Sequence, residues 1–312
     1  PMCRLVKALY RHPESGAHWE KHLEDILKDP RNDFGAQPVA GHPSTYWMER
    51  DKLLLTVYVD DLLLSGPSEA HEGFWAKLEP LVDIEEVTEL GRFLGRHHEI
   101  QRSELGGTVK YDMTDYAVNS VEMYTKVTGV DKFRPATTPF LPDGSLNPDD
   151  DETAGEIAPH ACALVMKQLW LARLARPDLC KAINILSSKV HKWSRNDDKR
   201  LYRLTCYLHA TTHYSIVGKI NDRPEELELT LFADADFAGD KDDTKSTSGC
   251  FLVLTGPNTY FPLSWFCQKQ TCTSRSTTES EIVSLANGVF SEGIPASILW
   301  SLILGRPIKT II

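Results

Sequence analysis

The chain has 312 residues, 41% of them apolar, and a formal net charge of −10. This length is sufficient for two or three domains with a sizeable core. The negative charge argues against a protein that simply coats nucleic acid, because non-specific affinity depends on neutralising phosphates with Lys and Arg. No stretch reaches the roughly 18 apolar residues of a membrane span, and the start lacks a secretory signal, so we expect no membrane partner.

The seven cysteines indicate neither a disulfide framework nor a zinc site. Their number is odd, they are scattered, and none forms a Cys-x-x-Cys pair. Reduced thiols are the default for such a pattern, so we expect an intracellular protein. The first residue is Pro rather than Met, which suggests a piece of a larger protein.

Two adjacent aspartates interrupt a long apolar stretch in the first quarter of the chain. The runs Leu53–Val59 and Leu62–Leu64 are rich in aliphatic and β-branched residues and predict two buried strands. Asp60 and Asp61 lie in the turn between them. An isolated Asp-Asp pair is usually a polar β-turn. Carboxylates between fully apolar strands are costly unless a cation meets them, and a hard divalent metal is the natural candidate.

The pattern around this hairpin is mainly helical. Helices are predicted within Cys3–Leu27, over Glu69–Leu81 and over Tyr111–Thr125. His97 and His98 could suggest a metal site, but adjacent residues of a strand point to opposite faces, so a shared metal is not expected.

An acidic, proline-rich segment, Arg134–Pro159, predicts an exposed linker. Its three consecutive aspartates, Asp149–Asp151, lack the alternate-residue ligands and central glycine of a calcium loop. Three helices are expected after the linker, over residues 164–175, 179–193 and 199–210.

A basic cluster in this helical region is the candidate nucleic-acid contact. It comprises Lys189, Lys192, Lys199, Arg200 and Arg203. From the sequence alone, a solvated helix face explains the cluster equally well.

The last region combines strands with a helix. Leu227–Ala233 is apolar on one face and predicts a strand that delivers Asp234, with Asp236 two residues on. Strands over Cys250–Leu254 and Leu263–Cys267 would continue an antiparallel meander.

A helix is predicted to begin after Ser276 or Thr277, either of which can cap it. Its expected buried stripe comprises Ile282, Leu285, Ala286 and Val289. Glu281 lies in its first turns. An acid on a strand facing an acid on the following helix suits a two-metal nuclease, although such glutamates are also ordinary helix-dipole partners.

Motifs along nearly the whole chain resemble those of copia-type (long-terminal-repeat) retrotransposon Pol polyproteins. Tyr58–Asp61, followed by Leu-Leu-Leu-Ser-Gly, resembles the YVDD box of their reverse transcriptases. The stretches ADADFAGDKDDTKSTSGCFLVL and PLSWFCQKQTCTSRSTTESEIVSL resemble their ribonuclease H pattern. Lys7–Tyr10 and Trp19 fit a family segment that borders the nucleotide pocket, whereas Arg11 and Glu14 depart from it.

The resemblance implies roles for four acids. In the family, the first aspartate of the box helps to hold two magnesium ions, which makes Asp60 a metal ligand and Asp61 its neighbour. By position, Asp234 and Glu281 would be metal-binding acids of the ribonuclease H site. The implied cofactor is Mg²⁺ or Mn²⁺. The implied partners are an RNA template, an RNA–DNA hybrid and the rest of the polyprotein, in cytoplasmic particles or the nucleus.

We therefore expect an α+β fold with a partial reverse-transcriptase palm, a helical connection and a truncated ribonuclease H-like domain. The expected ranges are 1–133 for the palm and following segment, 134–159 for the linker, 160–226 for the connection and 227–312 for the last domain. Both metal sites would need further aspartates outside the chain, so we expect them to be half-built.

The function implied is that of a polyprotein fragment whose parent is an RNA-directed DNA polymerase with hybrid-specific ribonuclease H activity. For the chain itself we predict little or no catalysis. The alternative is a degenerate or repurposed copy that binds nucleic acid or protein without catalysis. Arg11 and Glu14 favour that alternative, because an acid near an incoming triphosphate would repel it.

Overall fold

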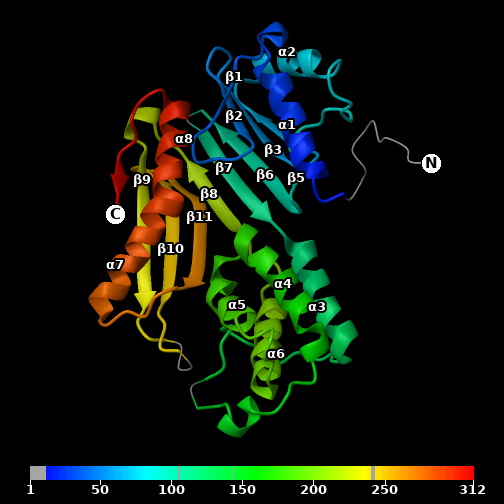
Figure 1. Cartoon of the computed structure of the whole chain (residues 1–312), viewed down its shortest axis with the longest axis vertical. Coiled ribbons are helices and arrows are strands. Elements are labelled where there is room, and N and C mark those ends of the chain that lie inside the picture. The colour runs from blue at the N-terminus through cyan, green and yellow to red at the C-terminus, as the bar shows by residue number, and fades with distance from the viewer. Residues whose placement is uncertain (1–11, 105, 143, 240–242) are drawn as a thin grey trace, which may run out of the picture. The chain divides into compact units, whose positions relative to one another are not determined.

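The computed structural model describes residues 12–104, 106–142, 144–239 and 243–312 (Figure 1). Helices and strands are mixed along the chain, which confirms the predicted α+β class. The chain divides into two compact units: residues 1–90 with 294–308, and residues 91–293 with 309–312. The segment Lys7–Arg11, which carries part of the predicted nucleotide-pocket resemblance, lies outside the described residues.

The first unit is built on a four-stranded antiparallel sheet in the order β1-β2-β3-β4. Its strands are β1 (Ala36–Pro38), β2 (Thr45–Met48), β3 (Leu53–Tyr58) and β4 (Asp61–Ser65). Its helices are α1 (Ser15–Lys28), α2 (Ser68–Leu78) and α8 (Ile294–Leu304). Leu53 and Leu55 alternate along β3 and share a core with Leu23 and Leu27 of α1, because every second strand residue faces the same side.

Strands β3 and β4 form the hairpin predicted from the sequence. Tyr58 pairs with Asp61, so the connecting loop consists of Val59 and Asp60 alone. Asp61 is therefore the first residue of β4 rather than a turn residue. The two carboxylates stay adjacent, but only Asp60 lies at the tip.

The second unit contains an eight-stranded sheet in the order β12-β9-β10-β11-β8-β7-β6-β5. These strands are β5 (Arg92–Phe93), β6 (Arg96–Ser103), β7 (Gly106–Asp112), β8 (Ile216–Ile220), β9 (Glu228–Asp236), β10 (Thr247–Thr255), β11 (Tyr260–Lys269) and β12 (Thr310–Ile311). Strand β12 pairs with β9 in parallel, and the other neighbours are antiparallel. The predicted meander of three strands is thus the β9-β10-β11 part of a larger sheet.

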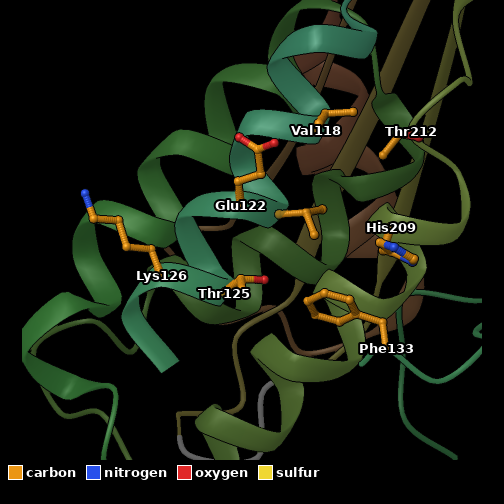
Figure 2. Close-up of a pocket in the computed structure, with 8 residues that line it drawn as sticks. Val118, Glu122, Thr125, Lys126, Phe133, His209 and Thr212 are labelled. Atoms are coloured by element: carbon orange, nitrogen blue, oxygen red, sulfur yellow. The ribbon is translucent and has the colours of Figure 1, made fainter. Parts of the chain in front are cut away.

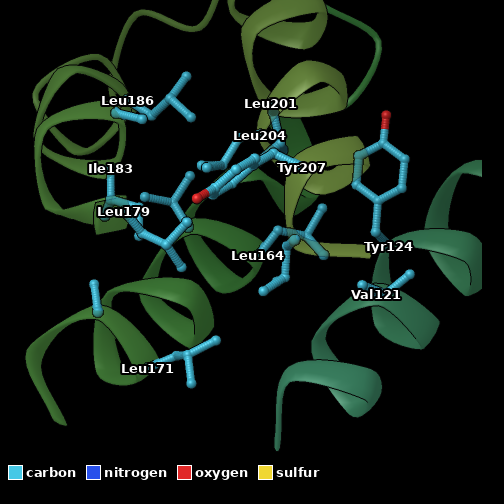
Figure 3. Packing of buried hydrophobic residues seen from close by; sticks show 14 of the residues in the cluster. Val121, Tyr124, Leu164, Leu171, Leu179, Ile183, Leu186, Leu201, Leu204 and Tyr207 are labelled. Carbon is cyan, nitrogen blue, oxygen red and sulfur yellow. The ribbon is translucent and has the colours of Figure 1, made fainter. Parts of the chain in front are cut away.

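The second unit also contains α-helices. They are α3 (Thr114–Thr128), α4 (Ala158–Leu174), α5 (Cys180–Ser187), α6 (Arg195–Ala210) and α7 (Thr277–Gly288). Figure 3 shows the core between α3, α4, α5 and α6, into which Leu164 and Leu171 of α4 point together with Leu201 and Leu204 of α6. Their spacing places each pair on one helix face, which explains why the helical periodicity of this region predicted these helices.

The segment 134–159 is only partly the exposed linker predicted from its composition. Asp149, Asp151 and Glu152 are exposed, but Gly155 and Ile157 are buried. A Cβ atom on Gly155 would lie 2.6 Å from the Ser194 carbonyl oxygen, so this position requires glycine. Polar composition predicted solvation, whereas the backbone polar groups of this segment find partners beside α6.

One apolar helical stretch stands out among the described residues. By length and composition alone, Thr277–Leu304 could cross a membrane, although only 22% of its most apolar window is buried. One such helix is weak evidence for a membrane span.

Candidate active site

The first pair of candidate acids lies at a hairpin turn that accepts a hydrogen bond from helix α1. Val59 has φ 57°, in the left-handed region that β-branched residues rarely adopt. The indole Nε1 of Trp19, on α1, donates a hydrogen bond to the Val59 carbonyl oxygen at 2.5 Å. Helix α1 therefore contributes to the conformation of the tip that presents Asp60.

Asp60 and Asp61 are both exposed. Among residues 12–104 and the other described ranges, neither carboxylate has a salt-bridge partner. The costly burial that the sequence suggested is avoided because the tip projects into solvent. Both carboxylates are accessible to a cation from solution.

The second pair begins on β9. Asp234 and Asp236 share one face of this strand with Phe232, and all three are exposed. Lys181, on α5, donates to Asp236 Oδ2 at 2.8 Å. Asp236 is therefore neutralised within the protein, whereas Asp234 has no ion-pair partner among the described residues.

Helix α7 is attached to β9 at Asp234 itself. Ser284 Oγ donates to the Asp234 carbonyl oxygen at 2.7 Å and contacts the Gly249 carbonyl oxygen at 3.3 Å. Glu281 lies almost one turn before Ser284 and is exposed. Ser276, one of the two caps that the sequence allowed, accepts a hydrogen bond from the Glu279 amide, and Thr277 is the first residue of the helix.

The buried face of α7 is not the apolar stripe predicted from the sequence. None of the residues Ile282, Leu285, Ala286 and Val289 is buried, and Ile282 is 61% exposed. The face against the sheet carries Ser280, Ser284 and Gly288. Small residues allow close approach, since a Cβ atom on Gly288 would lie 3.2 Å from Cys250 Sγ. Hydrophobic periodicity failed here because the contact is made by small and hydroxyl side chains.

A buried polar network that the sequence did not predict fixes the start of α7. Gln270 Nε2 donates to Ser248 Oγ at 3.0 Å and to the Ser280 carbonyl oxygen at 2.9 Å. Ser274 Oγ donates to Gln270 Oε1 at 3.2 Å. The motifs Lys-Ser-Thr-Ser-Gly and Gln-Lys-Gln contain Ser248 and Gln270, and were the available signal for this network.

The described residues contain no complete set of metal ligands. Within residues 12–104, 106–142, 144–239 and 243–312, no group of three or more His, Cys, Asp or Glu side chains could hold a metal ion. Asp60, Asp61, Asp234 and Glu281 are exposed carboxylates, the kind of oxygen ligand that hard divalent cations accept. That both metal sites are half-built stays a prediction.

The histidine pair does not add a ligand set. Burial lowers the pKa of His98 to about 4. Its ring packs edge-on against Tyr111, with the ring centroids 5.3 Å apart. His97 and His98 pair with successive residues of β7 and belong to no metal-ligand group among the described residues.

The predicted basic cluster is engaged in contacts within the chain. Lys199 Nζ donates to Asp150 Oδ2 at 2.6 Å, and Arg200 Nη1 donates to Asp197 Oδ1 at 2.7 Å. Arg203 Nε donates to the Thr138 carbonyl oxygen at 2.9 Å. The two remaining members are Lys189 and Lys192, and the latter is exposed.

A separate apolar cavity of about 440 Å³ lies between α3 and the end of α6. Figure 2 shows Val118 and Glu122 on one wall and the stacked rings of Phe133 and His209 on the other. The two ring centroids are 4.9 Å apart. No candidate acid lines this cavity, so it does not belong to either carboxylate centre.

Known proteins similar to this chain include transposon polyproteins and shorter proteins, and no family model matches. The retrovirus-related Pol polyprotein from transposon RE1 of Arabidopsis thaliana is 29% identical over 290 residues, which is 92% of this chain. An uncharacterized mitochondrial protein of the same plant is 29% identical over 235 residues, or 75% of this chain and 90% of its own length. A secreted RxLR effector protein of Plasmopara viticola is 32% identical over 118 residues, or 38% of this chain and 78% of its own length.

The chain spans only 18% of the length of the RE1 polyprotein, and the same share of the related RE2 polyprotein. The aligned part nevertheless extends over both compact units and over both pairs of acids.

Proposed function

This chain belongs to the copia-type retrotransposon Pol polyproteins, and from that premise we propose that its second unit carries part of a ribonuclease H site. Asp234 and Glu281 would hold magnesium there. One observation supports the proposal: Ser284 Oγ donates to the Asp234 carbonyl oxygen, so α7 contacts β9 at Asp234 within one turn of Glu281. Bound magnesium would activate a water molecule and offset charge at the scissile phosphate.

The chain's own residues would prepare this site in two ways. The Gln270 network fixes the first turns of α7, and with them the backbone that carries Glu281. Lys181 neutralises Asp236 on the same strand face, whereas Asp234 has no ion-pair partner among the residues that the structure describes. A cation from solution would therefore meet Asp234 rather than Asp236.

We propose a corresponding role for the hairpin in the first unit. Asp60, with Asp61 beside it, would be a magnesium ligand of the parent's RNA-directed DNA polymerase. On this interpretation residues 1–133 are palm and following segment, 160–226 a helical connection and 227–312 a ribonuclease H-like domain. The RNA template, the hybrid and the rest of the polyprotein would be the partners of that parent.

Manganese titration followed by paramagnetic broadening of backbone amide signals tests the ribonuclease H proposal. Broadening should centre on Asp234 and the first turns of α7. Asp234→Asn and Glu281→Gln should each weaken manganese binding about tenfold, since each removes one of two carboxylates. Glu225→Gln, which removes an exposed acid in the 3₁₀ turn just before β9, is the matched control and should not change manganese affinity. Equal manganese affinity in Asp234→Asn and the unchanged chain would refute the assignment.

Cleavage of a labelled RNA–DNA hybrid separates binding from catalysis. With two carboxylates at the site, we expect little or no magnesium-dependent cleavage by the 312-residue chain. Measurable cleavage that disappears in Asp234→Asn would show instead that the chain completes a working centre.

A second candidate is a non-catalytic copy that binds nucleic acid or protein. It is favoured by the relatives that this chain matches over 90% and 78% of their own lengths, because such short relatives exist apart from a full polyprotein. Asp60→Asn and Asp234→Asn distinguish the candidates. They should abolish metal-dependent activity in an enzyme, and leave or raise nucleic-acid affinity in a binder, since a negative charge near phosphate is removed.

A further inference from the structure

The start of α6 carries an unusual concentration of positive charge. Arg195, Lys199 and Arg200 all lie in its first two turns. The positive end of the helix dipole disfavours cations at this end of a helix. Acids must therefore offset these three side chains, and the structure shows which acids do so.

Two acids of the segment before α4 lie over these cations. The Asp150 carboxylate lies between Lys199 Nζ at 2.6 Å and Arg195 Nη1 at 3.8 Å. Asp151 Oδ1 is 3.8 Å from Arg200 Nη1. Each cation of the group thus has a carboxylate from the same short 3₁₀ turn, Pro148–Asp151.

The backbone around this turn is fastened to α6 by bonds that do not involve the two carboxylates. Asn196 Nδ2 donates to the Asn147 carbonyl oxygen at 2.7 Å. The Arg195 amide donates to the Thr153 carbonyl oxygen at 2.8 Å. These bonds on either side of the turn hold Asp150 and Asp151 in place, so changing the carboxylates to amides leaves the frame intact.

The covered cations remain within reach of solvent. The side chains of Lys199 and Arg195 are 41% and 51% exposed, whereas that of Asp150 is 18% exposed. Partly exposed ion pairs contribute little to stability and exchange partners readily. Arg200 is different, because it also binds Asp197, whose 1% exposed carboxylate closes the capping box with Ser194. Lys199 and Arg195 are therefore the two cations able to change partner.

We propose that the start of α6 is a binding site for the phosphate backbone of nucleic acid, and that Asp150 and Asp151 cover it as an internal substitute for phosphate. The inference rests on the nucleic-acid partner of the proposed function, but it needs neither metal centre. It explains how a chain with a net charge of −10 keeps a phosphate-binding surface that is closed at rest.

Fluorescence anisotropy with a labelled single-stranded RNA oligonucleotide tests the proposal on the full chain. The variant Asp150→Asn/Asp151→Asn uncovers the cations. The control Asp149→Asn/Glu152→Gln removes the same charge from two exposed neighbours for which no cationic partner is described. We expect the first variant to bind the RNA about tenfold more tightly at low salt. The slope of log affinity against log salt concentration should steepen by an amount equivalent to one or two additional phosphate contacts. The control should gain about twofold, through net charge alone.

Lys199→Gln supplies the second measurement. Placed in the uncovered variant, it should remove most of the gained affinity, whereas in the unchanged chain it should have almost no effect. Equal affinities of the uncovered variant and its control would overturn the proposal, as would an equal loss from Lys199→Gln in both backgrounds. Amide spectra of each variant report whether it is folded, and should Asp150→Asn/Asp151→Asn not fold, Asp150→Asn alone takes its place, because Asp150 pairs with both Lys199 and Arg195. Manganese titration at Asp234 is independent of these results.

Discussion

The two pairs of candidate acids are held in place by different physical means. At the hairpin tip, Asp60 follows a left-handed Val59, and one indole hydrogen bond from Trp19 reaches the turn. At the end of β9, Asp234 lies on a nine-residue strand to which α7 is fastened by buried hydroxyl and amide groups. One pair depends on a local backbone conformation, the other on a buried network.

This difference determines how each pair should respond to change. A buried polar network loses much free energy when one member is removed, because its partners stay buried without hydrogen bonds. An exposed turn loses little, because water replaces any lost partner. We therefore expect the β9 pair to be sensitive to mutation near it and the hairpin pair to be tolerant.

The largest effect should come from Gln270→Leu. It removes the bonds to Ser248, Ser274 and Ser280 and should destabilise the second unit by about 3 kcal/mol, since several buried groups lose partners at once. Urea unfolding measures this change. Gln268→Leu, at an exposed position near the end of β11 and two residues before Gln270, is the control and should stay within about 0.5 kcal/mol. Similar costs for the two variants would contradict the network's role.

The next largest effect should be a loss of stability of the second unit at acidic pH. The pKa of His98 is about 4 in the fold, below the roughly 6.5 of an unfolded chain. The unfolded state binds the proton first, so stability present above pH ~6.5 is lost as pH falls towards 4. Because the ring is partly exposed, we expect a loss of about 1 kcal/mol.

Hydrogen exchange of β6 and β7 amides should accelerate over this pH window relative to β3 and β4, after correction for intrinsic rates. The carboxylate of Asp29 in the first unit has a pKa lowered to about 2 by its bonds with Arg31, so it does not titrate in that window. His98→Gln should remove the difference. A difference that persists in this variant would assign the acid sensitivity to another group.

A matched pair of single-bond deletions compares the sites most directly. Ser284→Ala removes a buried donor to the Asp234 carbonyl and should cost about 1 kcal/mol or more, whereas Trp19→Phe removes an exposed donor to the Val59 carbonyl and should cost about 0.5 kcal/mol. Thermal unfolding of both variants measures the difference. Equal costs would mean that burial does not separate the two sites.

The smallest effect should be a gain in the stability of the β3–β4 hairpin. Val59→Asn places a residue that tolerates the left-handed region at the turn, and should stabilise the hairpin by about 0.5 kcal/mol. Amide exchange in β3 and β4 would slow accordingly. The control is Val87→Asn, because Val87 lies at an exposed loop position, whereas Val57 is buried. Faster exchange in Val59→Asn would show that the turn is not strained.

The sequence predicted elements with a clear periodicity and missed contacts between distant segments. The β3–β4 hairpin and the helices α4 and α6 follow from apolar runs and helical spacing, which local physics determines. The packing of α7 does not, because Ser280 and Ser284 give no hydrophobic signal. The contacts of Lys199 and Arg200 with the acidic segment were also missed. Composition alone does not show which charged residues form ion pairs when they lie about 49 residues apart in the sequence.

The joining of β7 to β8 affects the order in which the chain folds. Val109 pairs with Gly218, so one edge of the β6–β7 hairpin stays unpaired until more than a hundred further residues have left the ribosome. An unpaired edge is a template for association with other chains. The polar and charged side chains along β6 and β7, among them Arg102 and Lys110, protect the nascent hairpin during this interval. Replacing them with apolar residues would lower the yield of folded protein, because nascent chains would associate during synthesis. The stability of the finished fold would change little.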